Sequence, residues 1–299
     1  MKKKKSHKKL KYYATCYAFS LPFFIIFCIF TVCPVLLSIV IGFTDFNMLE
    51  MPRFVGLDNY IRLFLEDDIF IIALKNTLIL AAVTGPVSYI MALLIAWVIN
   101  ELKPVARSIV TTIFYAPSLA GNVLLIWTVL FSSDSYGFAN GWLQTLGLID
   151  EPIRWFFDAK YIMPLVIVVV LWSSMGTNFL SFIAAFQGVD KTLYEAAAMD
   201  GVKNRFQELW YVTLPSMRPQ LLFGVVMSIS SAFGIGTVVT GLTGFPSTEY
   251  AAHTIVNHLE DYGGIRYEMG YASAIATVLF AIMLLVNFVA KRAISKIGE

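Results

Sequence analysis

The chain has 299 residues, of which 58% are hydrophobic and only 14% carry a formal charge. Soluble globular domains are typically about 45–50% apolar and about 25% charged. So few charged residues cannot cover a water-soluble globule of this size, which favours a membrane protein and argues against a soluble domain. The net charge of +2 is no evidence for a nucleic-acid partner, because the positive charge is concentrated in the N-terminal tail, and no such partner is expected.

Six long apolar segments without Asp, Glu, Lys or Arg follow one another along the chain. A helix needs about 20 mainly apolar residues to cross the hydrocarbon core, whereas strands of a membrane barrel run about 9–11 residues and alternate in polarity. The pattern therefore predicts an all-α membrane protein with six transmembrane helices, called spans one to six below. They cover approximately Phe19–Thr44, Asn76–Ile99, Ser108–Phe131, Tyr161–Gln187, Gln220–Phe245 and Met269–Ala290.

The distribution of basic residues predicts which side of the membrane each loop faces. With the N-terminus in the cytoplasm, 16 of the 22 Lys and Arg residues fall on the cytoplasmic side, as the positive-inside rule favours. Both termini are then cytoplasmic, as an even number of spans requires. The predicted organisation is a basic cytoplasmic tail over residues 1–18, a six-helix domain over 19–291 with a cytoplasmic loop at 190–219, and a C-terminal cytoplasmic tail over 292–299.

The loops on the opposite side, roughly 45–75, 132–160 and 246–268, carry 14 of the 20 acidic residues. They fit either ordinary solvated surface or a docking face for an extracellular partner. Within the first of them, Leu57–Ala73 has apolar residues at helical spacing. We expect this stretch to form a helix that lies along the membrane surface.

The loop between spans four and five has the pattern of two short helices joined by a bend. Asp190 is a candidate N-cap, a run of helix formers follows, and Gly201 suits the left-handed conformation that ends a helix. A second helical run, Asn204–Thr213, is expected to stop at Pro215 because proline cannot continue the hydrogen-bond ladder. Three consecutive alanines after Glu195 leave one flank smooth. That flank fits either a solvated connector or a surface on which another protein docks.

The string Glu195-Ala196-Ala197, followed by Gly201 and by Leu214-Pro215, resembles the EAA motif of binding-protein-dependent ABC importer permeases. In that family the loop forms the coupling helices, which lie in a groove of the ATP-binding subunit. The resemblance implies that Glu195 meets a basic residue of the ATPase and that Gly201 sets the bend. The residues that it assigns to ATPase coupling are Glu195, Ala196, Ala197, Ala198, Asp200, Gly201, Leu214 and Pro215.

Further strings resemble the carbohydrate-importing members of the family, of the maltose and multiple-sugar type. They are Phe54–Tyr60 with Ala73–Thr77, Leu242–Pro246, and Met269–Ala274. The second string departs from the family pattern, because it has Phe245 and lacks one glycine of the corresponding turn. The conformation of this turn is therefore left open.

The resemblance implies the permease subunit of an ATP-driven importer in the bacterial inner (cytoplasmic) membrane, with a sugar or oligosaccharide as its solute. Its implied partners are a second permease subunit in a heterodimer, a dimer of ABC ATPases that use the ATP, an extracellular solute-binding protein and membrane lipid. No catalytic residue, metal site or cofactor is expected in this chain. The sequence accordingly contains no Walker-type phosphate-binding motif.

Polar residues inside the apolar spans are expected to face the solute path, because polar groups that face lipid are costly. The small residues among them fit close helix packing as well as they fit a roomy cavity. The candidate path residues are Trp172, Ser173, Ser174, Thr177 and Asn178 in span four, with Ser230, Ser231, Phe233 and Gly234 in span five.

Two alternative functions are weighed against sugar import. ABC import of glycerol phosphate or another polyol is the nearer one, since such permeases look similar. A secondary transporter is the alternative from another class, and it would normally carry ionisable residues or inverted repeats within the membrane. The six spans contain no Asp, Glu, Lys, Arg or His, which disfavours that class.

Overall fold

A computed structural model describes residues 2–120 and 123–294 of the chain. These residues form helices and connecting loops, and their one β-type pairing is an isolated bridge between Thr44 and Phe54. The all-α fold expected from the sequence is confirmed.

Four helical stretches of the described chain are long and apolar enough to cross a membrane. They are Thr15–Ile41, Asp68–Asn100, Ala159–Gly188 and Met269–Ala293. The first runs through α1 (Lys2–Phe27), the π-helical turn η1 (Cys28–Val32) and α2 (Cys33–Ile41). The second is α4 (Asp68–Asn100), the third joins α8 (Ala159–Ser173) to α9 (Thr177–Gly188), and the fourth lies in α16 (Met269–Ile294).

The predicted spans three and five are broken helices. The first pair, α5 (Pro104–Leu119) and α6 (Leu124–Leu130), is bent by 84°, and the second, α13 (Arg218–Phe233) and α14 (Gly236–Thr243), by 40°. Each pair passes the length and composition test for a membrane span only when its two helices are counted together. The described residues therefore provide four to six candidate spans.

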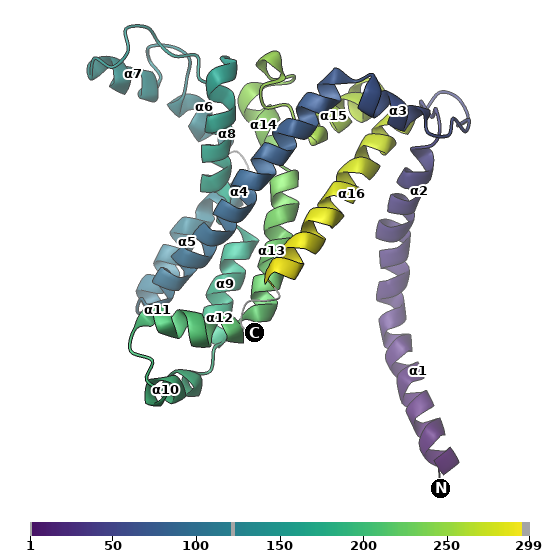
Figure 1. The fold of residues 1–299 in the computed structure, drawn as a ribbon, viewed down its shortest axis with the longest axis vertical. Helices are drawn as coiled ribbons and strands as arrows, with labels where there is room; N and C mark the ends of the chain where they lie inside the picture. The colour runs from purple at the N-terminus through teal and green to yellow at the C-terminus, as the bar shows by residue number, and fades with distance from the viewer. Residues whose placement is uncertain (1, 121–122, 295–299) are drawn as a thin grey trace.

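Span one stands beside the bundle formed by the other helices (Figure 1). None of the residues in its most apolar window is buried, and Phe19 and Phe30 are 84% and 75% exposed. The chain rejoins the bundle at the end where spans two and six begin, and there the Gly270 N–H donates a hydrogen bond to the Phe46 carbonyl oxygen (2.8 Å). A Cβ on Gly270 would overlap the Thr44 carbonyl group, so glycine is required for this close approach.

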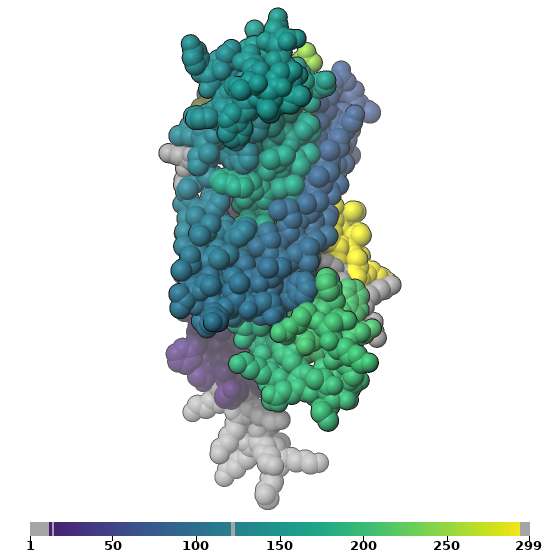
Figure 2. Space-filling view, turned by 90° about the vertical axis from the view of Figure 1, so that its left-hand side faces the viewer, coloured from purple at the N-terminus to yellow at the C-terminus, as the bar shows by residue number. Residues whose placement is uncertain are grey.

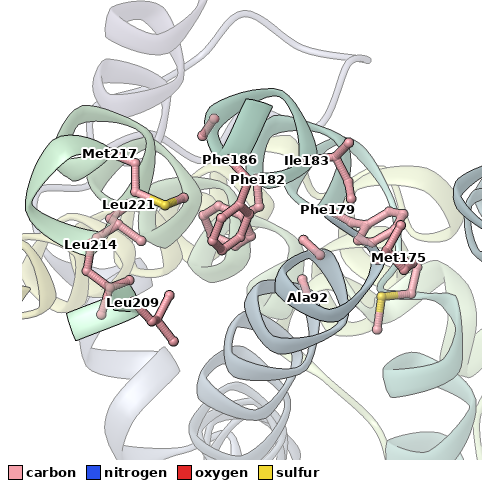
Figure 3. Packing of buried hydrophobic residues seen from close by; sticks show 13 residues of the cluster. Ala92, Met175, Phe179, Phe182, Ile183, Phe186, Leu209, Leu214, Met217 and Leu221 are labelled. Atoms are coloured by element: carbon pink, nitrogen blue, oxygen red, sulfur yellow. The ribbon is translucent and has the colours of Figure 1, made fainter. Parts of the chain in front are cut away.

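One hydrophobic cluster joins span two, span four and the loop between spans four and five (Figure 3). Phe179, Phe182 and Phe186 of α9 are buried in it together with Ala92 and Ala96 of α4. Small alanine side chains let two helix backbones approach closely. The loop adds three buried residues to the same cluster, Leu209, Leu214 and Met217, and the start of span five adds Leu221. This part of the loop is therefore firmly attached to the bundle.

The end of the bundle where spans two and six begin is organised around Asp67, the N-cap of α4. One carboxylate oxygen accepts a hydrogen bond from the Phe70 N–H (2.9 Å); the other bonds Tyr271 Oη (2.7 Å) and His258 Nε2 (2.9 Å). Burial by itself would raise the pKa of Asp67, but these bonds outweigh it and hold the pKa below its usual value. Asp67 thereby links the start of span two to the start of span six.

The remaining short helices also lie at this end of the bundle (Figure 1). They are α3 (Asp58–Leu65), α7 (Phe138–Thr145), η3 (Thr248–Tyr250), α15 (Ile255–Glu260) and η4 (Asp261–Ile265). The expected helix over Leu57–Ala73 is thus realised as α3 and the first turn and a half of α4. Asn140 of α7 holds its loop by donating to the carbonyl oxygens of Ser132, Asp134 and Ile153.

Candidate coupling surface and solute cavity

The loop between spans four and five begins with the expected helix and bend. The helix is α10 (Lys191–Met199), and Asp190 caps it by accepting a hydrogen bond from the Thr192 N–H (3.0 Å). This hydrogen bond also holds the pKa of Asp190 below its usual value. Gly201 follows with φ of 94°, in the left-handed region that favours glycine. An added Cβ there would meet no atom within 4 Å, so glycine is needed for its backbone angle and not for space.

The second helix of the loop does not stop before Pro215, and that expectation is wrong. The helix comprises α11 (Arg205–Glu208), the π-helical turn η2 (Leu209–Thr213) and α12 (Leu214–Ser216), and it breaks at Met217. In the π turn the Leu214 N–H donates to the Leu209 carbonyl oxygen, five residues earlier. Pro215 then lies in the first turn of α12, where its missing N–H is tolerated.

The structure separates the predicted coupling residues into two groups. Most of those on and after α10 are exposed at the end of the molecule where this helix projects from the bundle (Figures 1 and 2). The exposed ones are Glu195, Ala196, Ala198, Asp200 and Gly201, while Ala197 is half-buried. Leu214, in contrast, is buried in the hydrophobic cluster, and Pro215 is half-buried. The first group is available to a partner, and the second attaches the loop to the bundle.

A cavity of about 320 Å³ lies between spans two, four and five. It sits where span four is interrupted between α8 and α9 and where span five bends after α13. Six of the predicted path residues line it: Ser173, Ser174, Thr177, Asn178, Ser231 and Gly234. The helix breaks therefore bring small polar residues of two spans to one place.

Three predicted path residues lie elsewhere. Trp172 packs edge-on against Trp127, with ring centroids 5.3 Å apart. Phe233 is buried and lines a separate apolar cavity between α4, α13 and α16. Ser230 is half-buried, and its carbonyl oxygen accepts a hydrogen bond from the Gly234 N–H (3.2 Å).

Span two contributes Thr84 and Ser88 to the cavity, and the sequence reasoning missed both. Their hydroxyls donate to carbonyl oxygens of their own helix, Thr84 to Leu80 (2.8 Å) and Ser88 to Gly85 (3.1 Å). Their spacing could have indicated a shared role, because two small polar residues four positions apart in an apolar span lie on the same helix face.

The described lining of the cavity carries no charged side chain and combines polar residues with apolar ones such as Val170, Met227 and Val238. Asn178 Nδ2 donates to Ser228 Oγ (2.8 Å), while Asn178 Oδ1 and Ser173 Oγ are buried without a hydrogen-bond partner. Buried polar atoms in native proteins nearly always have partners. These two atoms therefore keep an unused hydrogen-bonding capacity beside the cavity. The volume lies at the lower end of the range of small-molecule sites, about 300–1,000 Å³.

The sequence was compared with protein families and characterised relatives. The profile of a family described as "Binding-protein-dependent transport system inner membrane component" matches residues 85–298. The arabinooligosaccharides transport system permease protein AraP of Halalkalibacterium halodurans is 32% identical over 270 residues, which are 89% of this chain and 83% of AraP. The lactose transport system permease protein LacF of Rhizobium radiobacter is 30% identical over 288 residues, 94% of this chain and 93% of LacF.

The fold is similar to a chain in the crystal structure of a bacterial alginate ABC transporter in complex with an alginate pentasaccharide-bound periplasmic protein. The two chains superpose with a TM-score of 0.74 at 29% sequence identity. The similarity covers 98% of this chain and 99% of the other. The segment matched by the family profile, residues 85–298, includes the loop with α10.

Proposed function

Because this chain belongs to the family of binding-protein-dependent transport system inner membrane components, we propose that it forms half of the solute path of an ABC importer for a sugar or oligosaccharide. The observation that carries this proposal is the cavity between spans two, four and five, whose described lining has hydroxyl and amide groups and no charged side chain. Hydroxyl and amide groups suit a polyhydroxylated solute, and a lining without a compensating charge disfavours tight capture of an ionised solute within this subunit. The carbohydrate cargoes in the names of AraP and LacF support the same class.

The arrangement in the membrane follows from counting each bent pair as one span. The chain then has six spans, with both termini and α10 on the cytoplasmic side of the bacterial inner membrane. A second permease subunit completes the path, and an extracellular binding protein delivers the solute to it. The alginate transporter with its bound periplasmic protein supports this mode of delivery.

Coupling to ATP is assigned to the exposed face of α10. Its alanines leave the backbone accessible, and Glu195 and Asp200 flank them with negative charge. A dimer of ATPase subunits that grips this helix moves it when it closes on ATP. The buried half of the loop then passes this movement to the spans that line the cavity. The chain itself is a transport subunit and not an enzyme.

Substitution of Ser231 by tryptophan tests the cavity as the solute path. The indole would occupy much of the cavity and leave less room for the solute. We expect Ser231→Trp to lower ATP-dependent uptake into proteoliposomes by about tenfold or more. A tenfold loss corresponds to roughly 1.4 kcal/mol of binding free energy. Phe223→Trp is the matched control, because Phe223 lies on the same helix but its side chain is exposed on the bundle surface. Normal uptake by Ser231→Trp would place the path elsewhere.

The same assay separates the solute classes. Unlabelled neutral oligosaccharides should compete with the transported solute, and glycerol phosphate or a simple polyol should not. Competition by glycerol phosphate alone would overturn the carbohydrate proposal and favour the alternative ABC importer. Uptake driven by an ion gradient without ATP would favour a secondary transporter.

A further inference from the structure

The helix α10 is separated from the bundle by a polar cavity of about 510 Å³. The cavity is bounded by the cytoplasmic ends of spans two, three and four and by the second helix of the loop. Its lining includes Asn100, Glu101, Arg107, Gln187, Lys191 and Arg205. No residue of α10 itself is buried. Packing alone therefore does little to hold this helix against the spans.

One side-chain hydrogen bond crosses from α10 to the second helix of the loop within the described chain. It joins Tyr194 Oη to Thr213 Oγ1 at 2.9 Å. Thr213 is 3% exposed, and its hydroxyl also donates to the Glu208 carbonyl oxygen (3.2 Å). Because the Thr213 hydroxyl already donates its proton to that carbonyl oxygen, its oxygen accepts the hydrogen bond from the Tyr194 hydroxyl. Tyr194 and Ala197 are the two half-buried residues of α10, so this is the helix face that points to the bundle.

The segment that carries Thr213 is packed against span two. Leu209, in the same π turn as Thr213, is buried in the cluster that contains Ala96 of α4. Phe206 packs edge-on against Trp97 of α4, with ring centroids 5.1 Å apart. Movement of Thr213 along the membrane normal must therefore displace the cytoplasmic half of span two, which carries Thr84 and Ser88 of the solute cavity at its other end.

The helix α10, which carries Tyr194, can move relative to the bundle. The chain enters α10 through the extended residue Val189 and leaves it through Gly201, whose added Cβ would meet nothing within 4 Å. A short helix between two such joints is free to rock towards or away from the bundle. If only the backbone connected α10 to the bundle, a force applied to α10 would partly rotate the helix instead of moving the spans. A hydrogen bond that spans the cavity prevents this rotation.

We propose that Tyr194 is a positioning residue of the transport cycle, whose hydrogen bond to Thr213 transmits the movement of α10 to span two. This proposal rests on the proposed function of the loop as the ATPase docking site. It assigns different roles to adjacent residues of α10. Glu195, Ala196 and Ala198 face the ATPase, whereas Tyr194 faces inwards together with Ala197 and links the docked helix to the span.

Tyr194→Phe removes the hydroxyl and keeps the ring. A hydrogen bond contributes about 1 kcal/mol net, so we expect the ratio of solute transported to ATP hydrolysed to fall about fivefold. The variant should still co-purify with the ATPase subunits, because its exposed face is unchanged. Thr213→Val should have a similar effect, the double variant should be no worse than either single one, and Thr213→Ser should retain coupling because it keeps the hydroxyl.

Tyr211→Phe is the matched control. Tyr211 lies in the same loop and is 68% exposed, and its variant should transport like the wild type. Normal coupling in Tyr194→Phe, or additive losses in the double variant, would overturn the proposal. Glu195→Lys distinguishes this failure from a failure of the proposed function. If Glu195→Lys abolishes ATPase binding while Tyr194→Phe is normal, the docking site stands and the transmission route is wrong; if both variants are normal, the docking site is wrong as well.

Discussion

The imidazole of His253 should make the stability of this protein depend on pH. The ring is 2% exposed and lies 5.8 Å from the Phe245 ring and 5.7 Å from the His258 ring, and its Nε2 atom is buried without a partner. Burial, followed by the proximity of His258, lowers the pKa of His253 to about 4. The carboxylates of Asp67 and Asp261 oppose this shift without cancelling it.

The sign and size of the effect follow from proton linkage. Below the ordinary pKa of 6.5 the unfolded chain binds a proton at His253, and the folded chain excludes it until the pH approaches 4. The unfolded state therefore binds more protons in this window, so stability falls as the pH falls. With 1.36 kcal/mol for each unit of pKa difference, the loss between pH 7 and pH 5 is about 2 kcal/mol.

Thermal unfolding of the detergent-purified subunit at a series of pH values between 7 and 5 measures this loss. The His253→Phe variant keeps a buried ring but cannot bind a proton, so its melting temperature should vary less with pH than that of the wild type. Phe245→Leu is the control, because it disturbs the same contact without removing a titrating group. It should lower the melting temperature by a similar amount at every pH. An unchanged pH dependence in His253→Phe would refute the reasoning.

Two further predictions concern single side chains. A Cβ on Gly224 would lie 2.6 Å from Asn178 Oδ1 and 2.7 Å from Phe182 Cζ, so Gly224→Ala should cost about 1–3 kcal/mol of stability through overpacking and also slow uptake, because Asn178 lines the cavity. A melting temperature and an uptake rate equal to those of the wild type would contradict this. Asp67→Asn replaces the charged acceptor of the Tyr271 hydroxyl and should cost roughly 1.5–3 kcal/mol, seen as a lower melting temperature; an unshifted transition would show that the charge is unimportant.

The number and approximate place of the apolar segments could be predicted because the required length and composition are properties of the chain itself. The bends in spans three and five could not. The break after Phe233 depends on how Gly234 and Ile235 fit between α13 and α14. Span five is predicted as one continuous apolar segment, so the sequence pattern does not indicate where the helix bends.

In the loop between spans four and five, local features could likewise be predicted from the sequence, and a change in the helical hydrogen-bond pattern could not. The Asp190 cap and the Gly201 bend are local and were predicted correctly. The stop at Pro215 was predicted wrongly, because a π turn shifts the hydrogen bonds so that the proline begins a new helical turn. A rule based on the regular ladder cannot anticipate that change of register.

The candidate path residues of spans four and five were chosen for polarity, and polarity does not say which way a side chain faces. Asn178 and Ser231 line the cavity, whereas Ser230, adjacent in sequence, does not. Thr84 was overlooked because a hydroxyl bonded to its own helix is common in any membrane span. Their contact with the solute remains a prediction that the uptake assay tests.

The separation of span one from the bundle has a consequence for biosynthesis. Its hydropathy of 2.9 is the highest of the four long spans, and none of that window is buried against the rest of the chain. Such a helix can leave the translocon and settle in the bilayer before any later helix has been made. In the proposed topology, the lysine-rich segment that precedes it keeps its N-terminal end in the cytoplasm, as the positive-inside rule favours. Span one would then set the orientation in which every later segment is inserted, although it contributes little to the packing of the bundle.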